Sequence, residues 1–243
     1  MSSSRRIVLA EILDEMAPDD PQARRSRRDL QRVHIAMGTL FHLRRGIAHL
    51  RLPRPPRRIL ELGAGDGTLL LRLARALAEQ WPAVELTLLD RRDLISTETR
   101  AGFSALGWHV CVANADVLGW ARAQGAPHYD LCVTTLFLHH FREPELGEIL
   151  KAVATRSDAF LACEPRRDGW GWLGSRLVGA IGGNRVTRSD AVTSVAAGFA
   201  GNELSQAWPL SCGRWELVES RAFPFTHCFS ARALPAGQGR ISG

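Results

Sequence analysis

The chain has 243 residues, of which 45% are apolar, and a formal net charge of +6. This length suits one domain with a substantial addition, and no stretch approaches the roughly 20 apolar residues of a membrane span. The positive charge comes almost entirely from arginine, because Lys151 is the only lysine, and the arginine clusters lack the interleaved aromatics of a nucleic-acid stacking platform. We therefore expect a protein with a buried core that binds no nucleic acid.

The cysteines and the N-terminal residues favour a cytoplasmic protein. Five cysteines form an odd set without a Cys-x-x-Cys motif, and most lie in predicted strands, so we interpret them as reduced core thiols. The basic start of the chain is followed by too few apolar residues for a signal peptide. Neither zinc nor disulfides are expected.

The first predicted elements are helices. Asp20 fits an N-cap with Pro21 at the first helical position, and apolar residues then recur at spacings of three and four as far as about Leu50. This pattern predicts one amphipathic helix or two. The proline-rich stretch 51–57 predicts an extended linker into the first strand.

The most informative segment is the turn Glu61-Leu-Gly-Ala-Gly-Asp-Gly67, which follows the first predicted strand and opens a helix. Glycines at alternate positions let the chain turn sharply and leave no Cβ between the backbone and a small molecule. A dinucleotide fingerprint would need its third small residue where Thr68 stands, so a nicotinamide or flavin site is disfavoured. Without further motifs, such glycines are often only a connection.

Three later strands each end in polar residues. The second predicted strand ends in Asp90, and a carboxylate at a strand tip can accept from two vicinal hydroxyls, as in a ribose. The third ends in Ala115 and Asp116, and the fourth in His139 and His140. Asp90 also fits a capping residue, and Asp116 fits the N-cap of the next helix.

In this order the four motifs resemble those of the class I S-adenosylmethionine (SAM) dependent methyltransferases over about residues 58–160. The resemblance implies that Glu61 places the amino-acid end of SAM, that Asp90 holds the ribose and that Asp116 meets the adenine. It implies SAM as the cofactor, with S-adenosylhomocysteine as its product. No metal is expected, because the two histidines have no third ligand at a recognisable spacing. The predicted cofactor-binding residues are Glu61, Gly63, Ala64, Gly65, Gly67, Asp90, Arg91, Ala115, Asp116 and Thr134.

Alternating strands and helices predict an α/β fold with a Rossmann-like, doubly wound, mostly parallel sheet. The runs 215–222 and 226–232 are close enough to pair antiparallel, which matches the reversed last strand of the seven-stranded sheet in the resembled family. By the same resemblance, residues 1–50 form an N-terminal helical lid. Residues 51–243 form the methyltransferase domain, with a helical cap insertion at about 166–212.

The cap insertion is apolar and rich in glycine, which suits the wall of a concave small-molecule site. Packing in an ordinary helix-on-sheet core explains any one of its aromatics equally well. The segment is similar to bacterial methyltransferases of polyketide and quinone pathways. That similarity implies secondary metabolism and a hydroxylated acceptor that is largely apolar, aromatic or polyketide-like. The residues predicted to line its pocket are Met37, Phe41, Trp170, Trp172, Phe199 and Trp208.

Methyl transfer from a sulfonium is a direct displacement, so the protein must align donor and acceptor and remove a proton from a phenol or enol. His139 and His140 stand where open parallel sheets place ligands, and a neutral imidazole can accept that proton. We predict O-methylation, with His140 preferred to His139 as the base. Alternatively, the histidines are structural and one ring bonds to its own loop.

Two other functions stay open. An RNA or protein methyltransferase would share the glycine turn, but the fourth strand reads Thr134-Thr-Leu-Phe137 where a nucleobase or glutamine methyltransferase would carry a paired-proline motif. A SAM-fold protein repurposed as a non-methylating cyclase or as a binding module is the second alternative. The expected partner is a small-molecule acceptor, and assembly as a homodimer is left open.

Overall fold

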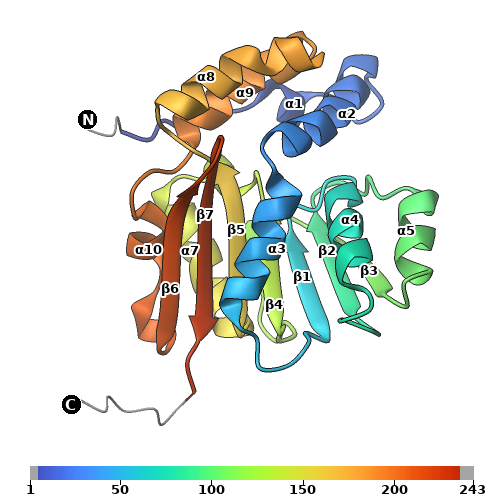
Figure 1. Cartoon of the computed structure of the whole chain (residues 1–243), viewed down its shortest axis with the longest axis vertical. Helices are drawn as coiled ribbons and strands as arrows, with labels where there is room; N and C mark the ends of the chain where they lie inside the picture. The colour runs from blue at the N-terminus through green and yellow to red at the C-terminus, as the bar shows by residue number, and fades with distance from the viewer. Residues whose placement is uncertain (1–4, 236–243) are drawn as a thin grey trace.

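A seven-stranded sheet with the order β3-β2-β1-β4-β5-β7-β6 runs through the computed structural model, which describes residues 5–235 (Figure 1). Neighbours among the first five strands pair in parallel, and β7 runs antiparallel to both β5 and β6. The predicted Rossmann-like α/β fold with a reversed last strand is therefore confirmed. The strands are β1 (Arg58–Leu62), β2 (Glu85–Asp90), β3 (His109–Asn114), β4 (Leu131–Thr135), β5 (Ala159–Pro165), β6 (Trp215–Ala222) and β7 (Thr226–Ala233).

Helices cover both faces of the sheet, because the central strands are apolar on both sides. Every residue of β4 and β5 is buried, as expected of strands inside a covered parallel sheet. One apolar cluster joins α3 (Thr39–Leu50), α4 (Thr68–Leu77) and α5 (Thr97–Ser104) to one face. A second cluster joins α6 (Val117–Arg122), α7 (Glu143–Arg156) and α10 (Glu203–Ala207) to the other.

A third group of elements lies above the carboxyl ends of the parallel strands (Figure 1). It consists of α1 (Ile12–Glu15), α2 (Pro21–Ala36), α8 (Gly169–Leu177) and α9 (Arg185–Ala197). α2 begins as predicted, since the Asp20 carboxylate accepts from the backbone N–H groups of Gln22 and Ala23. None of the helices in the described residues 5–235 has the length and apolarity needed to cross a bilayer.

The segments predicted as lid and cap each divide between this upper group and the sheet layers. The N-terminal helical pattern breaks at Gly38, and α3 then packs on β5 and β7, so within the predicted lid only residues up to Ala36 lie above the sheet. Within the predicted cap, α8 and α9 lie above the sheet, whereas α10 packs against α7 and β6. Residues 5–36 and 166–197 therefore form one cover.

Candidate functional site

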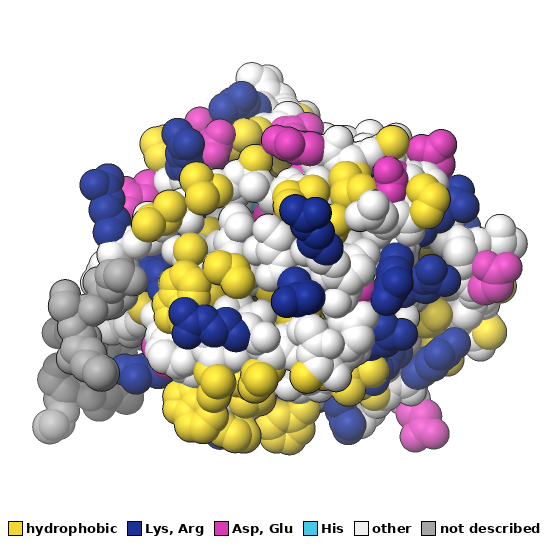
Figure 2. All heavy atoms as spheres, turned by 90° about the horizontal axis from the view of Figure 1, so that it is seen from above, with side chains coloured by type: hydrophobic (Ala, Val, Ile, Leu, Met, Phe, Trp, Pro, Cys, Tyr) yellow, Lys and Arg dark blue, Asp and Glu magenta, His cyan; other side chains and the backbone are white. Residues whose placement is uncertain are grey.

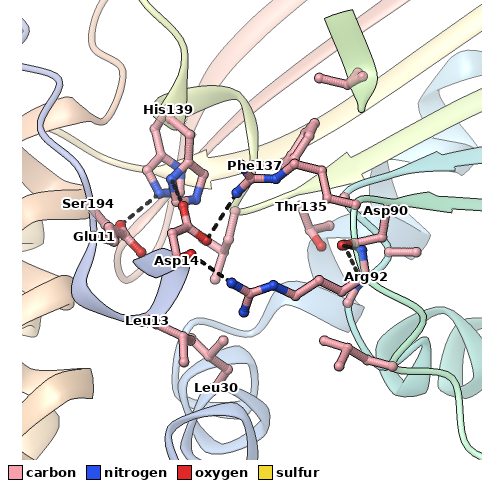
Figure 3. A pocket seen from close by; sticks show the side chains of 18 of the residues that line it. Glu11, Leu13, Asp14, Leu30, Asp90, Arg92, Thr135, Phe137, His139 and Ser194 are labelled. Carbon is pink, nitrogen blue, oxygen red and sulfur yellow. Dashed lines mark hydrogen bonds and ion pairs between the residues drawn. The ribbon is translucent and has the colours of Figure 1, made fainter. Parts of the chain in front are cut away.

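A cavity of about 590 Å³ lies between this cover and the carboxyl ends of β1 to β4 (Figure 3). Its floor is formed by the loops that follow these strands, and its roof by residues 8–11, Leu13, Asp14 and one face of α2. Open α/β sheets place their ligands at this edge. The cavity therefore lies where the sequence predicted a cofactor.

The glycine turn forms part of the cavity floor. Gly65 has a φ of +54°, and a Cβ added there would meet nothing within 4 Å, because the residue borders the cavity. A Cβ at Gly63 would lie 2.3 Å from the Phe137 ring, and one at Gly67 would lie 3.0 Å from Ile95. Gly67 does not line the cavity, so its role is packing, whereas Gly65 is the position that a ligand can approach.

Asp90 connects the second strand to this turn. Its Oδ2 accepts from the backbone N–H of Gly65 at 2.9 Å, and its Oδ1 accepts from the N–H of Arg92 at 3.0 Å. Each carboxylate oxygen can accept a further hydrogen bond. The N–H of Ala115 donates to the Asp90 carbonyl oxygen at 3.0 Å, which brings the tip of the third strand alongside. Asp90 thus fixes the turn and retains acceptor capacity toward the cavity.

Asp116 lines the cavity and also caps α6. Its Oδ1 accepts from the N–H of Leu118 at 2.8 Å and from the N–H of Gly119 at 3.2 Å. The capping interpretation is therefore confirmed. An adenine contact through the other carboxylate oxygen stays a prediction.

Glu61 is buried at the cavity floor, and its Oε2 has no hydrogen-bond partner among the described residues. Burial, together with the nearby carboxylates of Asp66 and Asp90, raises the pKa of Glu61 well above its usual range. An unpartnered buried carboxyl group is costly unless a donor or a cation completes it. This position is therefore suited to a cationic ligand group.

The fourth strand presents Thr135, not Thr134, to the cavity. Thr134 is fully buried, and its hydroxyl donates to the Leu62 carbonyl oxygen at 3.0 Å. Successive side chains of a strand point to opposite faces, so the prediction was wrong by one residue. The predicted cofactor residues that do line the cavity are Glu61, Gly63, Ala64, Gly65, Asp90, Arg91, Ala115 and Asp116.

His139 is held between two carboxylates. Its Nδ1 lies 2.8 Å from Oε2 of Glu164, and its Nε2 lies 3.4 Å from Oε1 of Glu11. Burial alone would lower the pKa of His139, but the hydrogen bonds to both carboxylates outweigh it and raise the pKa to about 9. His139 is therefore protonated at neutral pH and is no base there. Glu164 also accepts from the N–H groups of Phe137 and Leu138, which fixes the loop.

His140 has the opposite electrostatics. Burial and the adjacent His139 cation lower its pKa below the ordinary value, so its imidazole is neutral at pH 7. Its Nδ1 lies 3.4 Å from Oδ2 of Asp14, and the ring lines the cavity. Of the two predicted catalytic histidines, only His140 is in the protonation state that accepts a proton.

Sequence reasoning missed the N-terminal residues of the site. Glu11, from the segment before α1, binds the hydroxyl of Ser194 as well as His139 (Figure 3). The carboxylate of Asp190 accepts from the N–H groups of Ile12 and Leu13 at 2.9 and 3.0 Å. These partners are far apart in sequence, so no local pattern could have paired them.

The structure also supplies a third potential metal ligand beside the two histidines. Ligand atoms of Glu11, His139 and His140 lie within 4.8 Å of one another. Both ring nitrogens of His139, however, already face carboxylates. We therefore interpret these residues as a hydrogen-bonded ion pair beside a neutral imidazole.

α2 contributes the roof at the cofactor end. Its residues Arg27, Gln31 and His34 recur along one face and line the cavity. The side-chain amide of Gln31 donates to Oδ2 of Asp66, in the glycine turn, at 2.8 Å. The N-terminal segment is therefore bonded directly to the cavity floor.

The aromatics predicted for an acceptor pocket lie elsewhere, and this prediction is corrected. Phe199 and Trp208 are buried in the second apolar cluster, so the core interpretation applies to them. Phe41 and Trp170 are exposed on the outer surface. None of the six residues predicted for the acceptor pocket lines the cavity; these are Met37, Phe41, Trp170, Trp172, Phe199 and Trp208.

Comparison with known proteins agrees with this geometry. Residues 59–156 match the family described as a methyltransferase domain. The segment from β1 through α7 is therefore similar to a methyltransferase domain. Trans-aconitate 2-methyltransferase from Streptomyces avermitilis is 38% identical over 89 residues, which are 36% of this chain and 30% of that protein. The matched segment thus spans less than a third of the curated relative.

Solved structures share the fold of the matched segment and of the residues on either side of it. The plantazolicin methyltransferase BpumL, in complex with S-adenosylhomocysteine, is 16% identical with a TM-score of 0.60, covering 89% of this chain and 92% of that one. The mitomycin 7-O-methyltransferase MmcR is 16% identical with a TM-score of 0.56, covering 91% of this chain and 60% of that one. At this identity, the likeness shows the fold alone.

Proposed function

We propose that this protein transfers a methyl group from SAM to the oxygen of a small, largely apolar, hydroxylated acceptor and releases S-adenosylhomocysteine. The observation that carries the proposal is Glu61, which lines the same cavity as Gly65 and Asp90 and whose buried Oε2 has no partner among the described residues. SAM carries an ammonium group, a ribose and a sulfonium. A buried carboxyl group can bind the ammonium group and a carboxylate at a strand tip can bind the ribose. A backbone turn without side chains toward the cavity leaves room for the sulfonium.

The residues of the cavity fit SAM without any metal. Glu61 would accept from the ammonium group, whose positive charge lowers the pKa of the carboxyl back toward its usual range. Asp90 would accept from the ribose hydroxyls, and Ala115 and Asp116 would lie at the adenine. SAM supplies an electrophilic methyl group, and Gly65 leaves the space in which it can be bound.

His140 would take the acceptor's proton during the displacement. The acceptor oxygen forms a bond to the methyl carbon, the carbon–sulfur bond breaks, and the proton of the hydroxyl passes to the neutral imidazole. His139 cannot serve, because its pKa is about 9 and it is already protonated. The mitomycin 7-O-methyltransferase among the structural relatives supports oxygen as the acceptor atom.

Binding of S-adenosylhomocysteine by calorimetry tests the cofactor site. We expect one site per chain, which Gly65→Val abolishes by placing a branched side chain in the cavity. Gly107→Val is the matched control, because Gly107 also has a positive φ and open space but does not line the cavity. Both variants carry the same kind of backbone strain. Equal binding by the two variants would show that the cofactor site lies elsewhere.

Release of S-adenosylhomocysteine from SAM, measured with a panel of hydroxylated aromatic compounds, tests transfer separately. A binding module or a cyclase with this cavity would bind S-adenosylhomocysteine normally but release none with any acceptor. An RNA or protein methyltransferase would respond to those substrates instead.

A further inference from the structure

Five large apolar side chains stand exposed around the outer face of α8. They are Phe41, Trp170, Leu173, Leu177 and Phe223, with exposed fractions between 46% and 74%, and we call them the α8 surface. Figure 2 looks down on this end of the molecule and shows hydrophobic side chains gathered along one margin, with basic side chains beside them. Contiguous exposed apolar groups of this kind mark an interaction site.

These residues come from three elements that the fold holds together. Trp170, Leu173 and Leu177 share one face of α8 through their helical spacing. The ring of Phe223, in the turn between β6 and β7, lies edge-on to Trp170 with 5.9 Å between centroids. The Phe223 carbonyl oxygen bonds to the His42 ring at 2.9 Å, which places α3 and its exposed Phe41 alongside.

The charge around the α8 surface is strongly basic. Arg44 and Arg45 lie on α3 and Arg176 lies on α8, and all three are exposed. Residues 30–60 and 169–189 contain no Asp or Glu. The acidic residues directly before these ranges pair with arginines, Asp29 with Arg32 and Asp168 with Arg166.

We propose that the α8 surface docks onto an anionic lipid bilayer. Trp, Phe and Leu beside arginines are the composition of an interfacial membrane-binding face, in which the rings enter the headgroup region and the guanidinium groups meet anionic lipids. A second copy of the chain fits less well. A twofold contact between two copies would bring the basic residues of one copy close to those of the other, and like charges repel.

Cosedimentation of the full chain with vesicles tests the docking, whatever reaction the protein catalyses. We expect the protein to bind phosphatidylcholine vesicles that contain phosphatidylglycerol, to bind pure phosphatidylcholine weakly, and to dissociate at about 1 M salt, where the Debye length is about 3 Å. The double variant Trp170→Ser and Phe223→Ser should bind at least about tenfold more weakly, because it loses the two rings that enter the headgroup region of the bilayer. Leu210→Ser is the matched control, since Leu210 is similarly exposed but lies next to α7 on the other face of the sheet.

Charge reversal supplies an independent test that leaves the apolar groups intact. Arg44→Glu and Arg176→Glu should each weaken vesicle binding by at least about fivefold, the effect of about 1 kcal/mol per basic residue near an anionic surface. No binding to the anionic vesicles would overturn the proposal, and so would an equal loss in the Leu210→Ser control. A dimer in solution that the Trp170 and Phe223 substitutions dissociate would show that a second copy occupies the surface.

Discussion

The electrostatic difference between His139 and His140 predicts that only one of them affects the chemical step. A pKa of about 9 leaves roughly 1% of His139 neutral at pH 7, whereas burial and the His139 cation lower the pKa of His140 and favour its neutral form. His140→Gln should therefore lower the rate of methyl transfer by about 10²–10⁴-fold at neutral pH, the usual effect of losing a general base. The loss should shrink as the pH approaches the acceptor's own pKa, because a pre-ionised oxygen needs no base.

The assay is a pH–rate profile of S-adenosylhomocysteine release under single-turnover conditions. In the parent, the rate should rise with pH as His140 loses its proton and should level off above the lowered pKa of that residue. Added imidazole should partly restore His140→Ala but not a variant that binds SAM poorly. His128→Ala, at an exposed histidine away from the cavity, is the control. A His140 variant that keeps the parent rate and profile would refute the reasoning and leave alignment as the main cause of catalysis.

Three further predictions follow from the same contacts. Asp90→Ala should weaken S-adenosylhomocysteine binding by about 1.5–3 kcal/mol in calorimetry, the range for a charged hydrogen bond, and unchanged affinity would contradict the ribose role. Removing residues 1–36 should abolish acceptor turnover. The truncated protein should keep the circular dichroism spectrum of a folded protein, because α3 is retained. An undiminished rate would show that the roof of the cavity is not needed for catalysis. His139→Gln should destabilise the protein by about 3 kcal/mol more below pH 6.5 than above pH 9, since the folded-state pKa of about 9 exceeds the unfolded value and its stabilisation is lost as pH rises through 9. Urea unfolding at both pH values measures this difference, and a pH-independent difference would contradict the ion pair.

The parts of the site that sequence predicted are those fixed by neighbouring residues. The glycine turn and Asp90 follow buried strands directly, so the parallel sheet brings them to one edge whatever the rest of the chain does. The prediction that Thr134 faces the cavity was wrong for a related reason. The end of the fourth strand was correctly located, but which of two adjacent threonines faces the cavity depends on the phase of the strand relative to the sheet.

The parts that sequence could not predict depend on contacts between distant segments. Glu11 and His139 are 128 residues apart, and α9 helps to hold the start of the chain beside His139 through Asp190. The aromatics of the cap insertion carry no periodicity that separates a pocket wall from a core or from an outer face. Trp208 lies in the core and Trp170 lies on the surface, although both have apolar neighbours in the sequence.

The same long-range contacts connect the roof of the cavity with its chemistry. Glu11 stabilises the protonated form of His139, and that cation in turn lowers the pKa of His140, so the N-terminal segment helps to keep His140 neutral through an intermediate residue. Glu11 also acts on His140 directly in the opposite direction, since its negative charge favours protonation there. Replacing Glu11 by Gln therefore removes two opposing influences on the pKa of His140. On His139 it removes a hydrogen bond and a negative charge that both raise the pKa. In the Glu11→Gln variant the pKa of His139 should therefore fall, and by more than the pKa of His140 changes in either direction. Titration of the two rings by NMR would measure both pKa changes.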